Sequence, residues 1–248
     1  MLALAIVSCA EHAKEPSSRQ IKAGIELIVL GTVQDAGSPH IACKKSCCSA
    51  LFNKYDPSRK VSSLGIIDYD LHEVYLFDAS PDLTEQVKIL TISDPEIKQE
   101  TPNGIFLTHA HIGHYTGLMY LGKEAMHANA VPVYAMPRMT YFLENNGPWS
   151  QLVKLNNIQI QSIDSLEQIQ LSENLHVIPI QVPHRDEFSE TVGYYIHAAK
   201  KTVLFIPDID KWQKWNRNIV NEIQKVDYAF LDATFFDSKE LNNRDMSE

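Results

Sequence analysis

The strongest constraint on the fold is a stretch in which three histidines follow a short apolar run. Ile105–Leu107 is typical of a buried strand, and His109, His111 and His114 come soon after it. The apolar residues of Tyr115–His127 have helical spacing, which predicts that the histidines lie on a turn between a strand and a helix. Each buried imidazole needs hydrogen-bond partners for two nitrogens, so packing alone explains three of them poorly. A metal ion bound by neutral imidazoles satisfies them together; the alternative is three solvated loop histidines.

Other polar residues also stand where predicted strands end. Apolar runs predict strands that lead into Asp78, His184, Asp208 and Asp232. Functional side chains of layered folds commonly lie in the loops at one edge of a sheet. We therefore predict an α/β fold in which these four residues gather near the histidines.

Two further elements follow from the spacing of apolar residues. The alternating residues of Ile158–Leu171 predict a half-buried hairpin. An apolar stripe from Trp212 to Ile223 predicts one helix that begins at Lys211, with Asp210 as its N-cap.

The composition indicates one soluble globular domain. The chain has 248 residues, of which 44% are hydrophobic, and its formal net charge is −9. This acidic balance argues against a nucleic-acid-binding surface, which needs basic patches. The expected partner, from the reaction predicted below, is a small-molecule substrate. No apolar run in the sequence is long enough to span a bilayer.

The first residues resemble the end of a bacterial lipoprotein signal. Ile6–Cys9 would be the lipobox and Cys9 the acylated residue, although a basic segment before it is missing from the recorded start. Residues 1–20 would then be signal and tether, followed by a domain over residues 21–248. We expect a lipid-anchored protein of the bacterial cell envelope that faces the periplasm. The alternative is a cytoplasmic protein with a frayed N-terminus and an incidental cysteine.

The stretch Thr108–His114 resembles the Thr-His-x-His-x-Asp-His signature of the metallo-β-lactamase superfamily. The resemblance implies the four-layer αβ/βα sandwich of that superfamily over the chain after residue 24. It also implies a first metal site formed by His109, His111 and His184. Asp208 would be the carboxylate that bridges to a second metal.

The second site of this signature is incomplete. His114 would bind the second metal, but Gly113 stands in place of the signature aspartate. The superfamily also has a late histidine, and no histidine follows His197, so either the C-terminus is truncated or the ligand was never there. With only His114 and Asp208 left, we expect one firmly held zinc and a weak or absent second ion. His40 is either a substitute ligand for the second metal or, more simply, a loop histidine. Replacing Gly113 with aspartate would be expected to raise the occupancy of the second metal site.

The first loop narrows the resemblance to one branch. Gly31–Cys43 and Phe77–Asp82 are similar to the coenzyme PQQ synthesis protein B branch and to related cyclic phosphodiesterases of phosphonate breakdown. The first loop also contains three cysteines within six residues, Cys43, Cys47 and Cys48. Because an odd number of closely spaced cysteines cannot all pair in disulfides, a structural zinc is the better interpretation. That branch carries such a cysteine cluster, although the Cys-x3-Cys-Cys spacing leaves the fourth ligand open.

The predicted reaction is metal-assisted hydrolysis of a small phosphodiester or ester. A zinc-bound water has a pKa of about 7 and supplies hydroxide at neutral pH. Asp208 would orient this nucleophile, and His114, when not a ligand, would protonate the leaving group. Asp78 and Asp232 would accept imidazole N–H bonds and fix the tautomers of the ligands.

Two other functions stay open. A protein of the PQQ-synthesis branch would act as an oxidoreductase or carrier in cofactor maturation or transport. A non-catalytic, metal-binding lipoprotein on the remnant of an enzyme site is the other, and Gly113 and the absent late histidine favour it.

Overall fold

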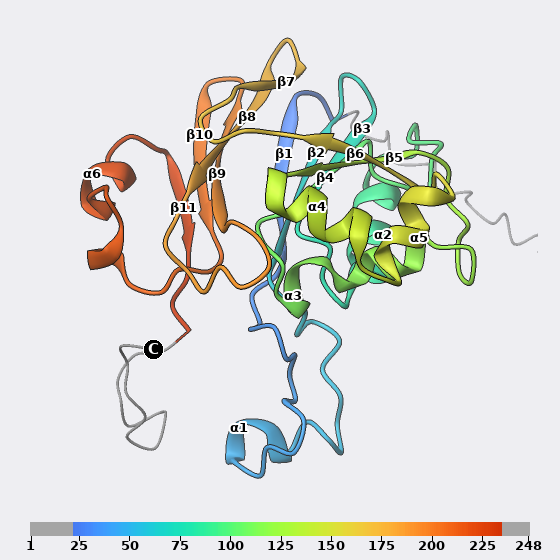
Figure 1. The fold of residues 1–248 in the computed structure, drawn as a ribbon, viewed down its shortest axis with the longest axis vertical. Helices are drawn as coiled ribbons and strands as arrows, with labels where there is room; N and C mark the ends of the chain where they lie inside the picture. Colours follow the sequence, from blue (N-terminus) through green and yellow to red (C-terminus); the bar gives the residue numbers. More distant parts are fainter. Residues whose placement is uncertain (1–21, 235–248) are drawn as a thin grey trace, which may run out of the picture.

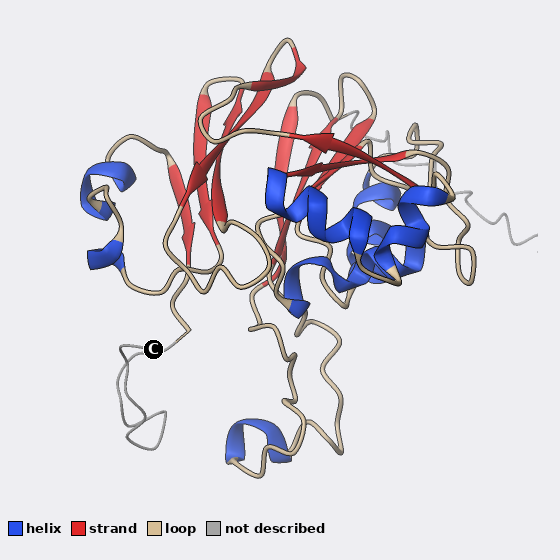
Figure 2. Ribbon diagram, viewed as in Figure 1, coloured by secondary structure: helices blue, strands red, loops and turns tan. Residues whose placement is uncertain are grey.

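The computed structural model describes residues 22–234, in which two sheets pack face to face (Figures 1 and 2). The strands of the first sheet, in spatial order, are β1 (Ile25–Gly31), β2 (Ser63–Asp68), β3 (Glu73–Phe77), β4 (Gly104–Phe106), β5 (Val131–Ala135) and β6 (Ile158–Ser162). The strands of the second are β11 (Tyr228–Leu231), β10 (Lys201–Ile206), β9 (Val192–Ala198), β8 (Leu175–Gln181) and β7 (Ile169–Ser172).

Helices cover the outer faces of both sheets (Figure 2). The first sheet carries α2 (Leu83–Ser93), α3 (Ile112–Tyr115), the 3-10 helix η1 (Thr116–Leu121), α4 (Pro137–Asn145) and α5 (Trp149–Lys154). The second carries the 3-10 helix η2 (Trp212–Lys214) and α6 (Ile219–Ile223). This layering is the αβ/βα sandwich, so the predicted fold class is confirmed.

The alternation of side chains along the strands divides the core into layers. Ile66 of β2 packs between the sheets together with Tyr194 of β9, whereas the next residue, Ile67, packs on the helix side with Leu90 of α2. Successive side chains of a strand point to opposite faces, so a strand buried on both sides is apolar throughout. Fully burying one such side chain stabilises the fold by roughly 1.5–3 kcal/mol.

The strand directions bring the site residues to one edge. Strands β3 and β4 are parallel, and β9 is antiparallel to both β8 and β10, so that β8, β10 and β11 share one direction. The carboxyl ends of β3, β4, β8, β10 and β11 lead into the residues predicted for the site: Asp78, His109, His111, His184, Asp208 and Asp232.

The hairpin predicted over Ile158–Leu171 is wrong in its pairing. The segment does form two strands, but β6 lies parallel to β5 in the first sheet and β7 lies antiparallel to β8 in the second. The chain crosses between the sheets at residues 163–168. Alternating hydrophobicity indicates a half-buried strand, but it does not name the partner strand.

The helix predicted over Tyr115–His127 is also shorter than expected. Helix α3 already begins at Ile112, and η1 continues only to Leu121 before Gly122 ends it. Gly117 lies so close to the loop after β3 that an added Cβ would be 2.1 Å from the Ser80 carbonyl oxygen. Packing against this loop therefore outweighs regular helical spacing.

The single helix predicted between Trp212 and Ile223 is two short ones. The Asn218 side chain accepts a hydrogen bond from the Asn221 N–H and starts α6 anew after η2. The tryptophan end of the predicted stripe packs on the second sheet, but Ile223 is 41% exposed.

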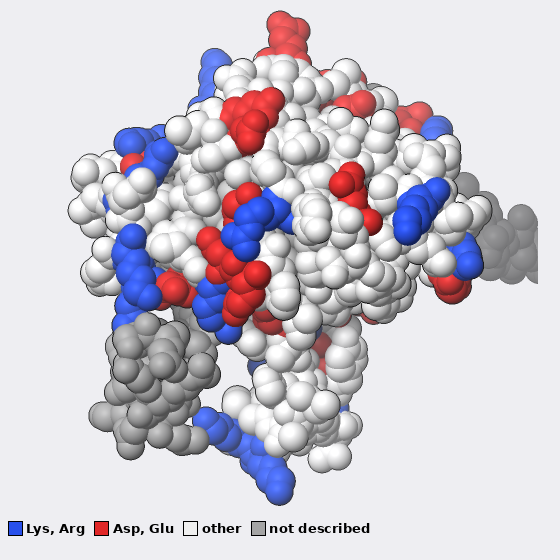
Figure 3. Space-filling view, in the orientation of Figure 1, with Lys and Arg blue, Asp and Glu red and all other residues white. Residues whose placement is uncertain are grey.

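The loop between β1 and β2 forms an arm that extends beyond the sandwich and carries α1 (Ser46–Ser49) (Figure 1). At its base, the Thr32 and Val33 N–H groups donate to the Lys60 carbonyl oxygen. On the face drawn in Figure 3, Lys and Arg side chains are interspersed with Asp and Glu.

No helix within residues 22–234 is long and apolar enough to cross a membrane. The predicted lipobox and tether, with Cys9, lie outside the described residues, so the expected lipid anchor stays a prediction.

Candidate metal centre

Four side chains from three strand ends converge on one point. His111 Nδ1 lies 2.9 Å from His109 Nε2 and 3.1 Å from His184 Nε2. The Asp208 carboxylate oxygen Oδ2 lies 3.2 Å from His109 Nε2 and 3.6 Å from His184 Nε2. The structure thus brings together the three histidines and the aspartate that the sequence assigns to a first metal site.

The other ring nitrogen of each histidine has its own partner, which fixes the ring orientation. His109 Nδ1 lies 3.0 Å from the Thr108 hydroxyl, and His111 Nε2 lies 3.1 Å from a Glu187 carboxylate oxygen. His184 Nδ1 lies 3.0 Å from Asp210 Oδ1. Such outer partners select the tautomer that leaves the inner nitrogen free to bind a metal.

Asp210 therefore has a different role from the predicted one. The 3-10 helix η2 has Lys211 at its N-cap position and no side-chain cap, so Asp210 does not begin a helix. Its carboxylate instead holds the His184 ring, a contact that an N-cap pattern read along the chain does not indicate.

Replacing Asp210 with alanine is expected to weaken zinc binding about 10- to 100-fold, because His184 loses the partner that orients it. Competition with a chromogenic chelator measures this affinity. Asp210→Asn is the matched control: its amide oxygen still accepts the imidazole N–H, so it should lose less. Equal zinc affinity in Asp210→Ala and the wild type would contradict this role.

The electrostatics keep the donor atoms in their metal-binding forms. Burial and the nearby His114 lower the pKa of His109 to about 3, and burial also lowers the pKa of His184, so both rings stay neutral. Burial opposes ionisation of Asp208, but the close contacts with the His109 and His114 rings bring its pKa well below the usual range. Neutral imidazoles and an ionised carboxylate are the forms that bind metal ions.

This donor set fits zinc. His111 Nδ1 has two neighbours at about 3 Å, His109 Nε2 and His184 Nε2. Because an imidazole nitrogen carries at most one hydrogen, His111 Nδ1 cannot donate to both of them. One ion with bonds of about 2.0–2.1 Å to each nitrogen would satisfy all of them, with the carboxylate as a further donor.

A second group of ligand atoms surrounds His114. Its Nε2 lies 2.9 Å from Asp35 Oδ1 and 3.4 Å from Asp208 Oδ2. Its Nδ1 lies 2.7 Å from Oδ2 of the fully buried Asp78, which also accepts a hydrogen bond from the Thr108 N–H. Burial disfavours a charge on His114, but the carboxylates of Asp78, Asp208 and Asp35 together outweigh burial and raise the pKa of His114 well above its usual range.

Sequence reasoning missed Asp35. This residue follows β1, as the other site residues follow their strands, and that position is the one signal that points to it. The structure places Asp35, His114 and Asp208 together as a further potential metal-binding group.

Asp232 contacts the backbone instead of an imidazole. Its carboxylate accepts hydrogen bonds from the Ile209 and Thr234 N–H groups and from the Thr234 hydroxyl. It therefore steadies the loop next to Asp208, and its predicted contact with a histidine ring is not found.

The three cysteines of the arm lie close together at its far end. The Sγ atoms of Cys43, Cys47 and Cys48 are free thiols that lie within 4.8 Å of one another. This agrees with a small metal site, although no further His, Asp or Glu among residues 22–234 joins the group. His40 is apart from both histidine groups, and its Nδ1 lies 2.8 Å from the Ile41 carbonyl oxygen.

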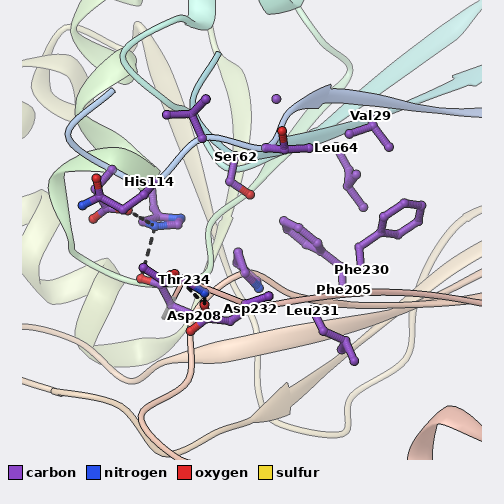
Figure 4. A pocket seen from close by; sticks show the side chains of 17 residues that line it. Val29, Ser62, Leu64, His114, Phe205, Asp208, Phe230, Leu231, Asp232 and Thr234 are labelled. Atoms are coloured by element: carbon purple, nitrogen blue, oxygen red, sulfur yellow. Dashed lines mark hydrogen bonds and ion pairs between the residues drawn. The ribbon is translucent and has the colours of Figure 1, made fainter. Parts of the chain in front are cut away.

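A pocket of about 440 Å³ opens beside the second group. Figure 4 shows His114 and Asp208 at one end of it and Val29, Leu64 and Phe230 at the other. The pocket thus joins a polar end with ligand atoms to an apolar wall.

A family model described as the beta-lactamase superfamily domain matches residues 74–247, which include the histidine signature. The chain belongs to this superfamily. The membership predicted from the signature is therefore confirmed. No curated protein matches the sequence.

Two solved structures show how far the fold is shared within the metallo-β-lactamase superfamily. Zn²⁺-bound PqqB from Methylobacterium extorquens is 22% identical with a TM-score of 0.69, over 88% of this chain and 76% of that one. A diphosphatase from the PhnP family is 22% identical with a TM-score of 0.51, over 75% of this chain and 66% of that one. At these identities the similarity establishes the fold.

Proposed function

We propose that the protein is a zinc-dependent hydrolase of a small phosphodiester or ester. The observation that carries the proposal is the convergence of three imidazole nitrogens and the Asp208 carboxylate next to a pocket. Membership of a superfamily that includes hydrolases supports hydrolysis in general. The diphosphatase among the similar structures acts, by its name, on a bond to phosphorus, so phosphorus-containing substrates such as phosphodiesters are the first to test.

His109, His111 and His184 would hold the ion. When bound, zinc lowers the pKa of a water ligand to about 7 and polarises the bond under attack. Asp208 has 19% of its side chain exposed and lines the pocket, so its carboxylate can accept a hydrogen bond from a water and orient it. The ionised state of Asp208 at neutral pH suits this role.

The pocket determines what class of molecule the site would take. Its volume of about 440 Å³ is in the range of small-molecule sites. The apolar wall of Leu64, Phe205 and Phe230 would hold an apolar part of the substrate, and the cleaved bond would lie at the Asp208 end.

Replacing His111 with alanine tests the site. The variant is expected to bind zinc at least about 100-fold more weakly, because a first ligand is lost where loss of an outer partner already costs about 10- to 100-fold. Zinc per chain by elemental analysis measures this in a Cys43→Ser, Cys47→Ser background, which removes the cysteine group. Hydrolysis of bis(p-nitrophenyl) phosphate and p-nitrophenyl acetate is followed in parallel.

His176→Ala is the matched control for this experiment, because His176 lies on β8 ahead of His184 but belongs to neither ligand group. It should keep both zinc and activity. Unchanged zinc content in His111→Ala would reject the ligand assignment. Bound zinc without turnover of any ester would reject the hydrolase.

A second candidate is a zinc-binding protein in cofactor maturation or transport. The similarity to Zn²⁺-bound PqqB and the glycine at position 113 support it. Stoichiometric zinc, no hydrolysis and binding of a quinone would favour this function. A non-catalytic lipoprotein would share the first two results and would also need acylation at Cys9.

A further inference from the structure

Position 113 has no room for the side chain that the superfamily signature places there. A Cβ added to Gly113 would lie 2.6 Å from Asp35 Oδ1 and 2.7 Å from Asp35 Cα and Cγ. Both a side chain and a backbone therefore occupy this space. The residue that fills it carries the same functional group as the one that is missing, a carboxylate.

We propose that Asp35 replaces the signature aspartate and, with His114 and Asp208, forms a second divalent-cation site. The ligand comes from the loop after β1 instead of the histidine turn. The inference extends the proposed function to a two-metal centre, and its catalytic meaning rests on that function. The binding of a second ion, in contrast, does not depend on the protein being a hydrolase.

The geometry of the three donors supports one shared ion. Asp35 Oδ1 and Asp208 Oδ2 lie 2.9 Å and 3.4 Å from His114 Nε2, and all three atoms lie within 4.8 Å of one another. The His114 side chain is 1% exposed, and Asp78 holds its outer nitrogen. The inner nitrogen is thus fixed toward the two carboxylates.

The concentration of negative charge around His114 also favours binding of a cation. Three carboxylates, those of Asp35, Asp78 and Asp208, contact a single imidazole. A divalent ion between Asp35 and Asp208 would neutralise the negative charge of these two carboxylates. One imidazole and two carboxylates are suitable ligands for zinc or manganese.

The position of this group relative to the pocket gives the second ion a role. Asp35, His114 and Asp208 all line the pocket, so water or substrate can complete the coordination. Asp208 contacts both groups and would connect the two ions, as a shared carboxylate does in two-metal hydrolases. The second ion would be held by fewer nitrogens and should bind more weakly than the first.

The test is the metal stoichiometry of Asp35→Asn, which keeps the size of the side chain but removes its charge. In the Cys43→Ser, Cys47→Ser background, titration with Zn²⁺ followed by elemental analysis is expected to give two ions per chain. Asp35→Asn should give one, and Gln34→Ala, a change in the same loop that removes no ligand, should give two. Thermal unfolding with and without Zn²⁺ is a second readout, in which Asp35→Asn should lose part of the metal-induced rise in Tm.

The outcomes separate this inference from the hydrolase proposal. Two ions in both the background protein and Asp35→Asn, or one ion in both, would overturn the role of Asp35, whatever the activity. A loss of one ion in Asp35→Asn would support it even if no ester is hydrolysed. In that case the hydrolase proposal alone would fail.

Discussion

Replacing Asp208 with asparagine is expected to reduce hydrolysis by about 10³-fold or more. The Asp208 carboxylate contacts His109, His114 and His184, so it belongs to both ligand groups. An amide is a poor metal ligand and a poor base, and losing several kcal/mol of transition-state stabilisation slows a reaction by about this factor. Steady-state kinetics at saturating Zn²⁺, with zinc content determined on the same samples, measures the effect.

Asp232→Asn is the matched control, since Asp232 is a second aspartate at the same edge and lines the same pocket. Its Oδ1 accepts from the Thr234 N–H and its Oδ2 from the Ile209 N–H, and an asparagine oxygen still accepts one of these two hydrogen bonds. This variant should lose less than about tenfold in rate. Comparable losses in the two variants would mean that Asp208 acts through the loop and not on the metal or water.

The parts of the site that the sequence predicted are those encoded by consecutive residues. The apolar run before His109 defines a strand, the strand defines where the turn lies, and the turn places His109 and His111 side by side. His184 and Asp208 could be predicted to lie beside them because each follows a strand, as the resemblance to the superfamily implies for its ligands. The fold class was predictable for the same reason, since strand and helix patterns are local.

The residues that the sequence did not predict depend on contacts between distant segments. Asp35 and His114 are 79 residues apart, and Asp210 reaches His184 over 26 residues. No local pattern distinguishes an aspartate that caps a helix from one that orients an imidazole. The pairing of β6 and β7 was missed for a related reason, because the choice of partner strand is a property of the whole sheet.

Restoring the signature by Gly113→Asp is expected to destabilise the protein and to empty the second site. The signature alone suggests the opposite, a gain of a ligand. A new Cβ, however, would lie 2.7 Å from the Asp35 Cα, so the loop after β1 would have to move. Overpacking costs about 1–3 kcal/mol, and a second carboxylate buried beside Asp35 adds to this cost. Denaturant unfolding of the metal-free protein measures the loss of unfolding free energy.

Two further substitutions separate the causes of this effect. Gly113→Ala places the same Cβ without a charge and should show most of the steric cost. Gly147→Asp adds the same side chain at an exposed turn where nothing lies within 4 Å of the Cβ, and should change stability by about 0.5 kcal/mol or less. If Gly113→Asp is as stable as the wild type and binds an additional ion, then the loop that carries Asp35 can move at little cost in free energy. Asp35 would then be a neighbour of the second site and not its ligand.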